Sequence, residues 1–138
     1  MIAYLDTSVV LRVLFGQAKP LQMWGRWERA YSSAMMGVEA RRAIDRLRLE
    51  SVLDDDGVVQ AHEALKIMER RLGTLRVTQV ALQRAALPMA TAVKTLDAIH
   101  LASALLLRER HVPSLTFATH DRQQATAARA LGFDVAGV

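Results

Sequence analysis

The sequence predicts an α/β domain in which a central, mostly parallel sheet is flanked by helices. Short apolar segments with the length of buried strands alternate along the 138 residues with longer segments of helical periodicity. This alternation is typical of parallel sheets, because each connecting helix returns the chain across a face of the sheet. One segment, 98–107, is apolar or small on nearly every side and is interrupted only by His100 and Ser103. We expect it to form a helix in the middle of the domain, since a helix without a polar face is buried.

Apolar runs and capping residues define the predicted elements of the N-terminal half. Residues 2–5 are apolar and end at an acid, as a buried strand does when it leads into a helix cap. Trp24 and Trp27 stand three residues apart, which places them on one face of a helix. In order, we expect a strand over 2–5, a helix over 9–15, a break over 16–20, a helical segment over 21–30, a strand over 31–35 and a strongly basic helix over 37–50.

Helix-start and helix-stop signals divide the C-terminal half. The acids at 54–56 suit the positive end of a helix dipole, and Gly73 suits the end of the same helix. Pro88 ends or kinks the next helix, and Gly132 closes the last one. We therefore expect helices over 54–72, 80–90, 95–107 and 121–131, and strands over 75–78, 115–118 and 133–135.

The composition is that of a soluble globular chain, because 51% of the residues are apolar and 23% are charged. The length suits a single domain over 1–138. The absence of cysteine excludes disulfides and thiolate metal sites and fits a cytoplasmic location. Residues 1–15 carry Asp6 and Arg12 and lack a basic leader, so no signal peptide is predicted. No apolar run approaches the roughly 20 residues that a membrane span needs.

Four acidic residues, Asp6, Glu39, Asp97 and Asp121, follow predicted strands or open the helices after them. In open α/β sheets, ligands bind outside the carboxyl ends of the strands, and these acids converge on that edge. Each has a simpler explanation, because Asp6, Asp97 and Asp121 also suit helix caps and Glu39 also suits an exposed surface. The sequence therefore leaves caps and a functional site as alternatives at each position.

Convergence of the four acids would require a compensating cation. Two carboxylates 4 Å apart repel by about 4 kcal/mol at an effective dielectric constant of ~20, and helix N-termini offset only part of this. Oxygen donors without histidine or cysteine select Mg²⁺ or Mn²⁺. Such an ion lowers the pKa of a bound water and stabilises charge on a phosphoryl oxygen. The pattern therefore indicates metal-assisted phosphodiester chemistry.

Four motifs make the chain similar to the PIN-domain ribonucleases, and above all to the VapC toxins of toxin–antitoxin pairs. No motif is specific singly, but the four occur in the family's order and span the whole chain. They are Tyr4-Leu5-Asp6-Thr7-Ser8-Val9, the segment from Ser32-Ser33 to Val38-Glu39, Leu96-Asp97-Ala98-Ile99-His100-Leu101-Ala102 and Phe117-Ala118-Thr119-His120-Asp121.

The resemblance implies a three-layer α/β/α PIN-like domain that acts as an Mg²⁺-dependent endoribonuclease. Its acidic site would consist of Asp6, Glu39, Asp97 and Asp121, with Asp121 binding the metal directly or through water. The resemblance further implies that Thr7, Ser8 and Thr119 orient the carboxylates or metal-bound water. In one departure, the family often has a threonine or another polar residue between Ser33 and Glu39, where this chain has Ala34-Met35-Met36-Gly37.

The charge outside the acidic site suits an RNA backbone. With four of the fourteen acids placed in the site, ten remain against eighteen basic residues, and the net charge is +4. Aromatic residues make up only 5%, too few to stack on several bases, so we expect recognition of a folded RNA by its shape. The basic residues nearest the acids in sequence are the candidates for RNA contact, although each also suits a solvated surface: Arg12, Arg41, Arg42, Lys94 and Arg122.

Other residues suggest partners and alternatives. The resemblance implies a homodimer and an antitoxin whose C-terminal segment lies in a groove, and an exposed Trp24 and Trp27 would provide one. His100 suits a buried core histidine, and His120 is a weaker candidate for a general base. Two other classes stay open: a catalytically idle PIN-like binding module, and a phosphoacceptor receiver domain, whose paired acids after the first strand and late lysine are missing here.

Overall fold

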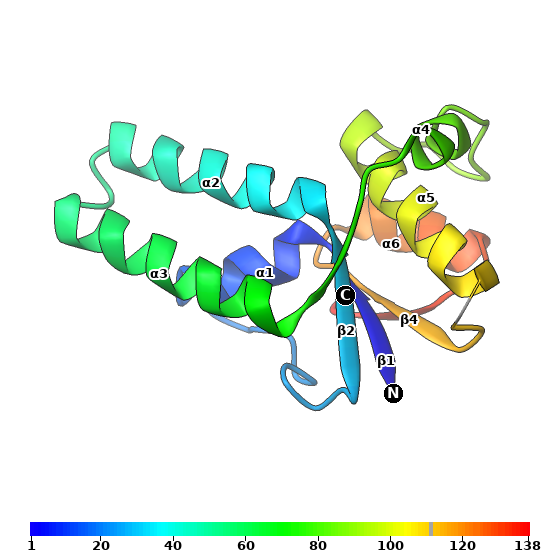
Figure 1. Cartoon of the computed structure of the whole chain (residues 1–138), viewed down its shortest axis with the longest axis horizontal. Helices are drawn as coiled ribbons and strands as arrows, with labels where there is room; N and C mark the ends of the chain where they lie inside the picture. The colour runs from blue at the N-terminus through cyan, green and yellow to red at the C-terminus, as the bar shows by residue number, and fades with distance from the viewer. Residues whose placement is uncertain (111) are drawn as a thin grey trace.

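The computed structural model describes residues 1–110 and 112–138, and its centre is a five-stranded sheet with the strand order β3-β2-β1-β4-β5 (Figure 1). All four strand pairings are parallel. Tyr4 of β1 lies between Tyr31 of β2 and Phe117 of β4 in the register. The carboxyl ends of the three inner strands therefore meet at one edge of the sheet. The strands are β1 (Ile2–Leu5), β2 (Arg29–Ser33), β3 (Gly73–Leu75), β4 (Leu115–Ala118) and β5 (Asp134–Ala136).

Helices cover both faces of the sheet and give the three-layer α/β/α architecture that the sequence predicts (Figure 1). Alternate residues of β1 enter different cores, because successive side chains of a strand point to opposite faces. Ala3 and Leu5 pack with α1, α2 and α3, whereas Tyr4 packs with α5 and α6. In the described part of the chain the helices are α1 (Thr7–Leu14), α2 (Ala34–Leu49), α3 (Asp55–Arg71), α4 (Gln79–Ala85), α5 (Thr95–Arg110) and α6 (Arg122–Ala130).

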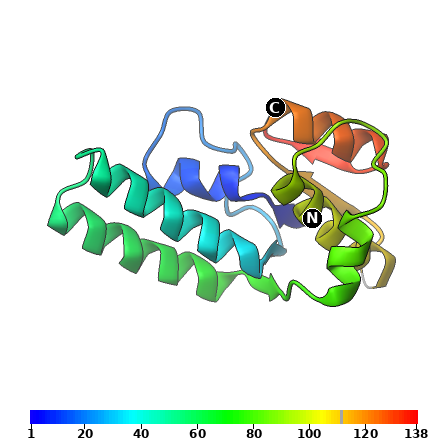
Figure 2. The same ribbon diagram turned by 90° about the horizontal axis from the view of Figure 1, so that it is seen from above.

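The long helices α2 and α3 lie side by side in both views and extend beyond the sheet (Figures 1 and 2). Helix α5 is the buried helix that the sequence predicts, and Leu101, Ala102 and Ala104 are completely inaccessible to solvent. Within 1–110 and 112–138, no helix has both the length and the apolar character needed to cross a membrane.

The prediction of a helix over 21–30 is wrong. This segment contains turns, with Gly25 at a φ of +77°, and β2 already begins at Arg29. Trp24 and Trp27 do lie together, with their rings edge to face and 5.2 Å between centroids. Their contact depends on the turn between them rather than on helical spacing.

The boundaries of β2, β3 and β5 also differ from the prediction, and those of β2 and β3 have a local reason. Strand β2 ends at Ser33 because the Ser33 hydroxyl accepts a hydrogen bond from the Met35 backbone N–H and caps α2, which therefore begins at Ala34 rather than Gly37. Gly73 belongs to β3 rather than to a helix end. A side chain at Gly73 would place its Cβ 2.4 Å from the Tyr31 ring, so only glycine lets β3 pair here with β2.

Candidate functional site

The four predicted acids lie at the carboxyl edge of the sheet. Asp6 directly follows β1 and caps α1, and Asp121 follows β4 and caps α6. Glu39 lies in α2, the helix after β2, and Asp97 lies in the first turn of α5. Because the inner strands run in the same direction, these helix starts gather over one edge.

Asp6 is almost completely buried, with 5% of its surface exposed, and each of its carboxylate oxygens has a defined neighbour. Oδ2 accepts a hydrogen bond from the Ser8 backbone N–H at 2.9 Å, as an N-cap does. Oδ1 accepts a hydrogen bond from Gln124 Nε2 at 3.1 Å and lies 3.6 Å from His100 Nε2. Asp6 is therefore both a helix cap and a rigidly held carboxylate that faces the acidic edge.

Glu39 is held by two donors that bind the same oxygen. The Thr7 hydroxyl donates to Glu39 Oε1 at 2.8 Å, and His100 Nε2 lies 2.7 Å from that oxygen. The other ring nitrogen of His100, Nδ1, lies 2.7 Å from the Tyr4 hydroxyl. The imidazole is fully buried and stacks edge-on against the Tyr4 ring. His100 is thus the buried core histidine that the sequence suggests, and it also contacts a site carboxylate.

The charges of the four acids act on one another. Burial and the negative charges of Asp6, Asp121 and Glu39 raise the pKa of Asp97 from its ordinary 3.8 to about 6, although His100 opposes the rise. The pKa of His100 is also raised: burial lowers it, but the hydrogen bond to Glu39 and the charges of Asp6, Glu39 and Asp97 outweigh burial. The structure therefore brings the four acids into one electrostatic cluster.

A buried hydrogen-bond chain connects the Asp121 end of the cluster to the Asp6 end. The Thr119 hydroxyl accepts from the Asp121 backbone N–H at 3.0 Å and donates to Gln124 Oε1 at 2.7 Å. Asp121 Oδ1 in turn accepts from the Gln124 backbone N–H at 2.8 Å. The Ser8 hydroxyl lies 3.4 Å from that of Thr119. Of the predicted supporting residues, Thr7 therefore contacts Glu39, whereas Ser8 and Thr119 belong to this series of hydrogen bonds.

Sequence reasoning missed Gln124, whose side chain is completely buried between Thr119 and Asp6. A signal was present, because Asp121 and Gln124 have the spacing of a helix capping box. Here the glutamine side chain turns into the site instead of back to the cap. His100 has a comparable signal, since it lies one turn after Asp97 on the same face of α5.

The donor chemistry of the cluster fits a hard divalent cation. All four candidate ligands are carboxylates, and burial, followed by the charges of Asp6 and Asp121, raises the pKa of Asp97; a cation would relieve the part that comes from these charges. As the side chains are placed in 1–110 and 112–138, however, no three acidic or histidine residues form a group that would hold an ion. Binding of an ion by these acids would therefore need their side chains to move.

The predicted RNA-contact residues differ in their exposure and in their hydrogen-bond and ion-pair partners. Arg41 forms an ion pair with Glu69 at 2.7 Å and also donates to the Gly37 carbonyl. Arg42 pairs with Asp45 at 3.1 Å. The side chains of Lys94, before α5, and Arg122, at the start of α6, are exposed. Arg12 donates to the Lys19 carbonyl at 3.2 Å.

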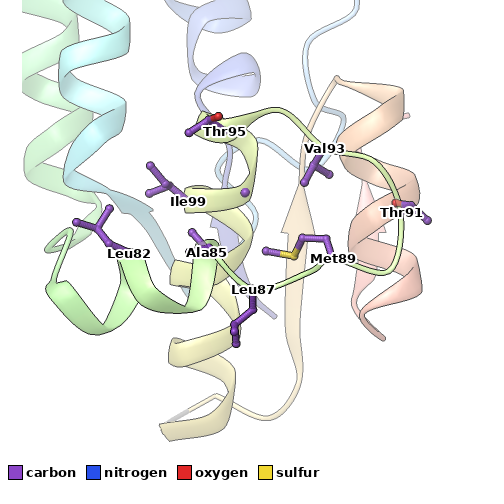
Figure 3. Close-up of a pocket in the computed structure, with 10 residues that line it drawn as sticks. Leu82, Ala85, Leu87, Met89, Thr91, Val93, Thr95 and Ile99 are labelled. Carbon is purple, nitrogen blue, oxygen red and sulfur yellow. The ribbon is translucent and has the colours of Figure 1, made fainter.

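Three hollows in the described structure bear on function. One, of about 320 Å³, is lined by Asp121 but by none of the other three acids, and Arg12, Arg46 and His120 are among its other lining residues. A second, of about 380 Å³, lies between Trp24, Trp27 and α3. The third, of about 430 Å³, is mostly apolar and is lined by α4, the segment before α5 and the first turns of α5 (Figure 3). His120 Nδ1 lies 2.7 Å from the Gly137 carbonyl.

A parallel α/β/α domain with a carboxylate cluster at the strand ends defines a class of candidate metal-dependent enzymes. Comparison with known families makes the assignment specific. The PIN domain family matches residues 3–130, so this chain belongs to the PIN domain family. This removes the basis for the receiver-domain alternative. No curated protein matches the sequence closely enough to count as a relative.

Solved structures with the same fold include several from toxin–antitoxin systems. A toxin–antitoxin complex from Klebsiella pneumoniae has a TM-score of 0.68 at 18% identity, with 93% of each chain covered. FitAcB from Neisseria gonorrhoeae has a TM-score of 0.65 at 24% identity, covering 98% of this chain and 96% of that one. VapBC-5 from Mycobacterium tuberculosis has a TM-score of 0.66 at 19% identity, covering 99% of this chain and 98% of that one.

Proposed function

We propose that this PIN domain is a metal-dependent endoribonuclease toxin of the VapC type, acting in the cytoplasm and neutralised by a cognate antitoxin. The observation that carries the proposal is the placement of Asp6, Glu39, Asp97 and Asp121 after the strands and in the helices at the carboxyl edge of the sheet. Membership of the PIN family and the likeness to toxin–antitoxin structures support it.

The four acids would hold Mg²⁺ or Mn²⁺, which when bound would activate water and stabilise charge on the scissile phosphate. Asp6 and Glu39 are the fixed side of this site, because buried donors already orient their carboxylates. Asp97 is only half-buried and Asp121 supplies a single oxygen to its own helix cap, so these two are the adaptable side. Rigid and adaptable ligands together suit an ion that demands near-octahedral geometry.

The hollow beside Asp121 is the proposed path for the RNA strand. Arg12 and Arg46 line it, and they supply the positive charge that a phosphate next to the scissile one needs. Lys94 and Arg122 are exposed, so they are further proposed contacts. Arg41 and Arg42 stay predictions, and each would have to share or leave its acidic partner to bind RNA.

Cleavage of RNA by the wild type and by Asp97→Asn tests the proposal. The wild type should cut RNA only with Mg²⁺ or Mn²⁺ present, and sequencing of the RNA ends identifies the cut. Asp97→Asn should lose cleavage while it keeps a wild-type circular dichroism spectrum. Asp55→Asn is the matched control, because Asp55 opens α3 on the exposed surface. Undiminished cleavage by Asp97→Asn would refute the assignment, and an inactive wild type that still binds RNA would favour the idle binding module.

The groove beside the two tryptophans is the proposed antitoxin site. Trp24, Trp27, Met68 and the half-exposed Ile67 present an apolar surface on one side of α3, which suits the apolar face of a partner helix. The test is first whether a small gene lies beside this one, and then co-purification of this protein with that gene's product. Ile67→Asp should abolish the complex, and Val52→Asp, at an exposed apolar residue in the turn before α3, should leave it intact.

We further propose that the protein is a homodimer assembled through the surface around α4. Five large hydrophobic residues are exposed within 77–96, beside the apolar pocket of Figure 3. Such a concentration is unusual for a surface that faces only water. Light scattering should give twice the monomer mass, and Leu87→Glu should reduce it to the monomer mass. The residues are Val77, Val80, Leu82, Leu87 and Leu96.

A further inference from the structure

His100 connects the interior of the fold to the acidic cluster through three short contacts. Its ring is completely buried in α5, with Nδ1 2.7 Å from the Tyr4 hydroxyl and Nε2 2.7 Å from Glu39 Oε1. Nε2 also lies 3.2 Å from the Thr7 hydroxyl. All four residues come from different parts of the fold, since Tyr4 belongs to β1, Thr7 to α1 and Glu39 to α2. Tertiary packing alone brings them together.

The direction of these hydrogen bonds follows from the donors and acceptors present. An ionised Glu39 carboxylate can only accept, so Nε2 must carry a proton that it donates to Oε1. In the neutral ring Nδ1 then accepts a hydrogen bond from the Tyr4 hydroxyl, which lies 2.7 Å away. Tyr4 therefore selects the ring orientation and tautomer that present a donor to Glu39.

The arrangement leaves one oxygen of Glu39 for a ligand. Thr7 and His100 both bind Oε1, and within the described part of the chain neither donor is directed at Oε2. The sequence just before Glu39, Ala34-Met35-Met36-Gly37, offers no polar side chain that would hold the carboxylate. A glutamate on the edge of a helix has three rotatable bonds, so it needs such support to stay in one orientation.

We propose that His100 is a positioning residue that orients Glu39 for metal binding, with Tyr4 fixing the imidazole behind it. The inference rests on the proposed function, because it concerns the same carboxylate cluster. His100 is not assigned contact with RNA or with the reacting atoms, since its ring is buried behind Glu39.

The test is calorimetric titration of the RNA-free protein with Mg²⁺ and with Mn²⁺, in a pair of variants that separate the two ring nitrogens. The amide nitrogen of glutamine reaches about as far as Nε2 of histidine, whereas that of asparagine reaches only about as far as Nδ1. His100→Asn should therefore weaken metal binding about tenfold to 100-fold, the range typical of residues that orient a metal ligand. His100→Gln should restore most of the affinity.

Controls separate positioning from a general loss of stability. Leu107→Ala empties a buried position two turns further along the same helix, so it should lower the stability of the fold and leave metal affinity unchanged. In a Glu39→Ala background, His100→Asn should cause no further loss of affinity. Tyr4→Phe keeps the aromatic ring and removes only the hydroxyl, so it gives a second readout if His100→Asn does not fold, with an expected loss of several-fold.

The outcomes distinguish this inference from the proposed function. If the wild type binds neither Mg²⁺ nor Mn²⁺, the metal-dependent function is refuted and the inference with it. If the wild type binds metal and His100→Asn binds equally well, only the inference is overturned. It is also overturned if the glutamine and asparagine variants lose affinity equally, or if His100→Asn still weakens binding without Glu39.

Discussion

Replacement of Asp97 by asparagine should stabilise the metal-free protein at neutral pH, even though it should abolish cleavage. The folded protein raises the pKa of Asp97 from its ordinary 3.8 to about 6, because of burial and the charges of Asp6 and Asp121. At about 1.4 kcal/mol for each pH unit, this difference amounts to about 3 kcal/mol of destabilisation once Asp97 is ionised. Asp97 is only half-buried, so solvent screening should reduce the effect to about 1–2 kcal/mol.

The sign of the pH dependence follows from the two pKa values of Asp97. Well below pH 3.8 the residue is protonated in both the folded and the unfolded state, and the variant should have no advantage. Between pH 4 and pH 6 the folded state binds more protons than the unfolded state, so the wild type loses stability as the pH rises. Above pH 6 Asp97 is ionised in both states, and the wild type's loss of stability relative to the variant reaches its full size.

Urea denaturation of the wild type and Asp97→Asn, in a chelating buffer at about pH 3 and at about pH 7.5, measures this effect. The free energy of unfolding of the variant should exceed that of the wild type at the higher pH and equal it at the lower pH. Equal stability at pH 7.5, or a gain of the same size at both pH values, would show that the acids do not destabilise one another. Saturating Mg²⁺ should then stabilise the wild type more than the variant, because binding to the folded state alone raises stability.

Three further substitutions test the packing around the site. Gln124→Leu removes the acceptor of the Thr119 hydroxyl and the donor to Asp6 Oδ1, so the free energy of unfolding should fall by about 1–3 kcal/mol in urea; an unchanged value would contradict this. Gly137→Ala forces a side chain onto a φ of +103° and places a Cβ 2.4 Å from the Thr119 carbonyl oxygen. The free energy of unfolding, measured in urea, should therefore fall by about 1–3 kcal/mol. Leu101→Ala empties a fully buried position in α5 and should cost about 2–5 kcal/mol, whereas a loss below 1 kcal/mol would mean that the layers repack.

The elements that the sequence predicted best are those with strong local signals. Strands over 2–5 and 115–118 are apolar runs bounded by polar residues, and both have the predicted limits. The buried helix was predicted from its all-round apolar character and extends further, to Arg110. The helix predicted over 21–30 is absent because two tryptophans three residues apart can meet across a turn as well as on one face of a helix.

Periodicity and strand-end position were enough to specify the α/β/α architecture and to place four acids at one edge of a parallel sheet. They could do so because strand direction and helix starts are written into local stretches of sequence. The partners of the acids were decided by the tertiary structure. His100 meets Glu39 across 61 positions of sequence, and Gln124 meets Asp6 across 118. Such contacts depend on how α5 and α6 pack against the sheet, and no short-range pattern in the chain encodes that packing.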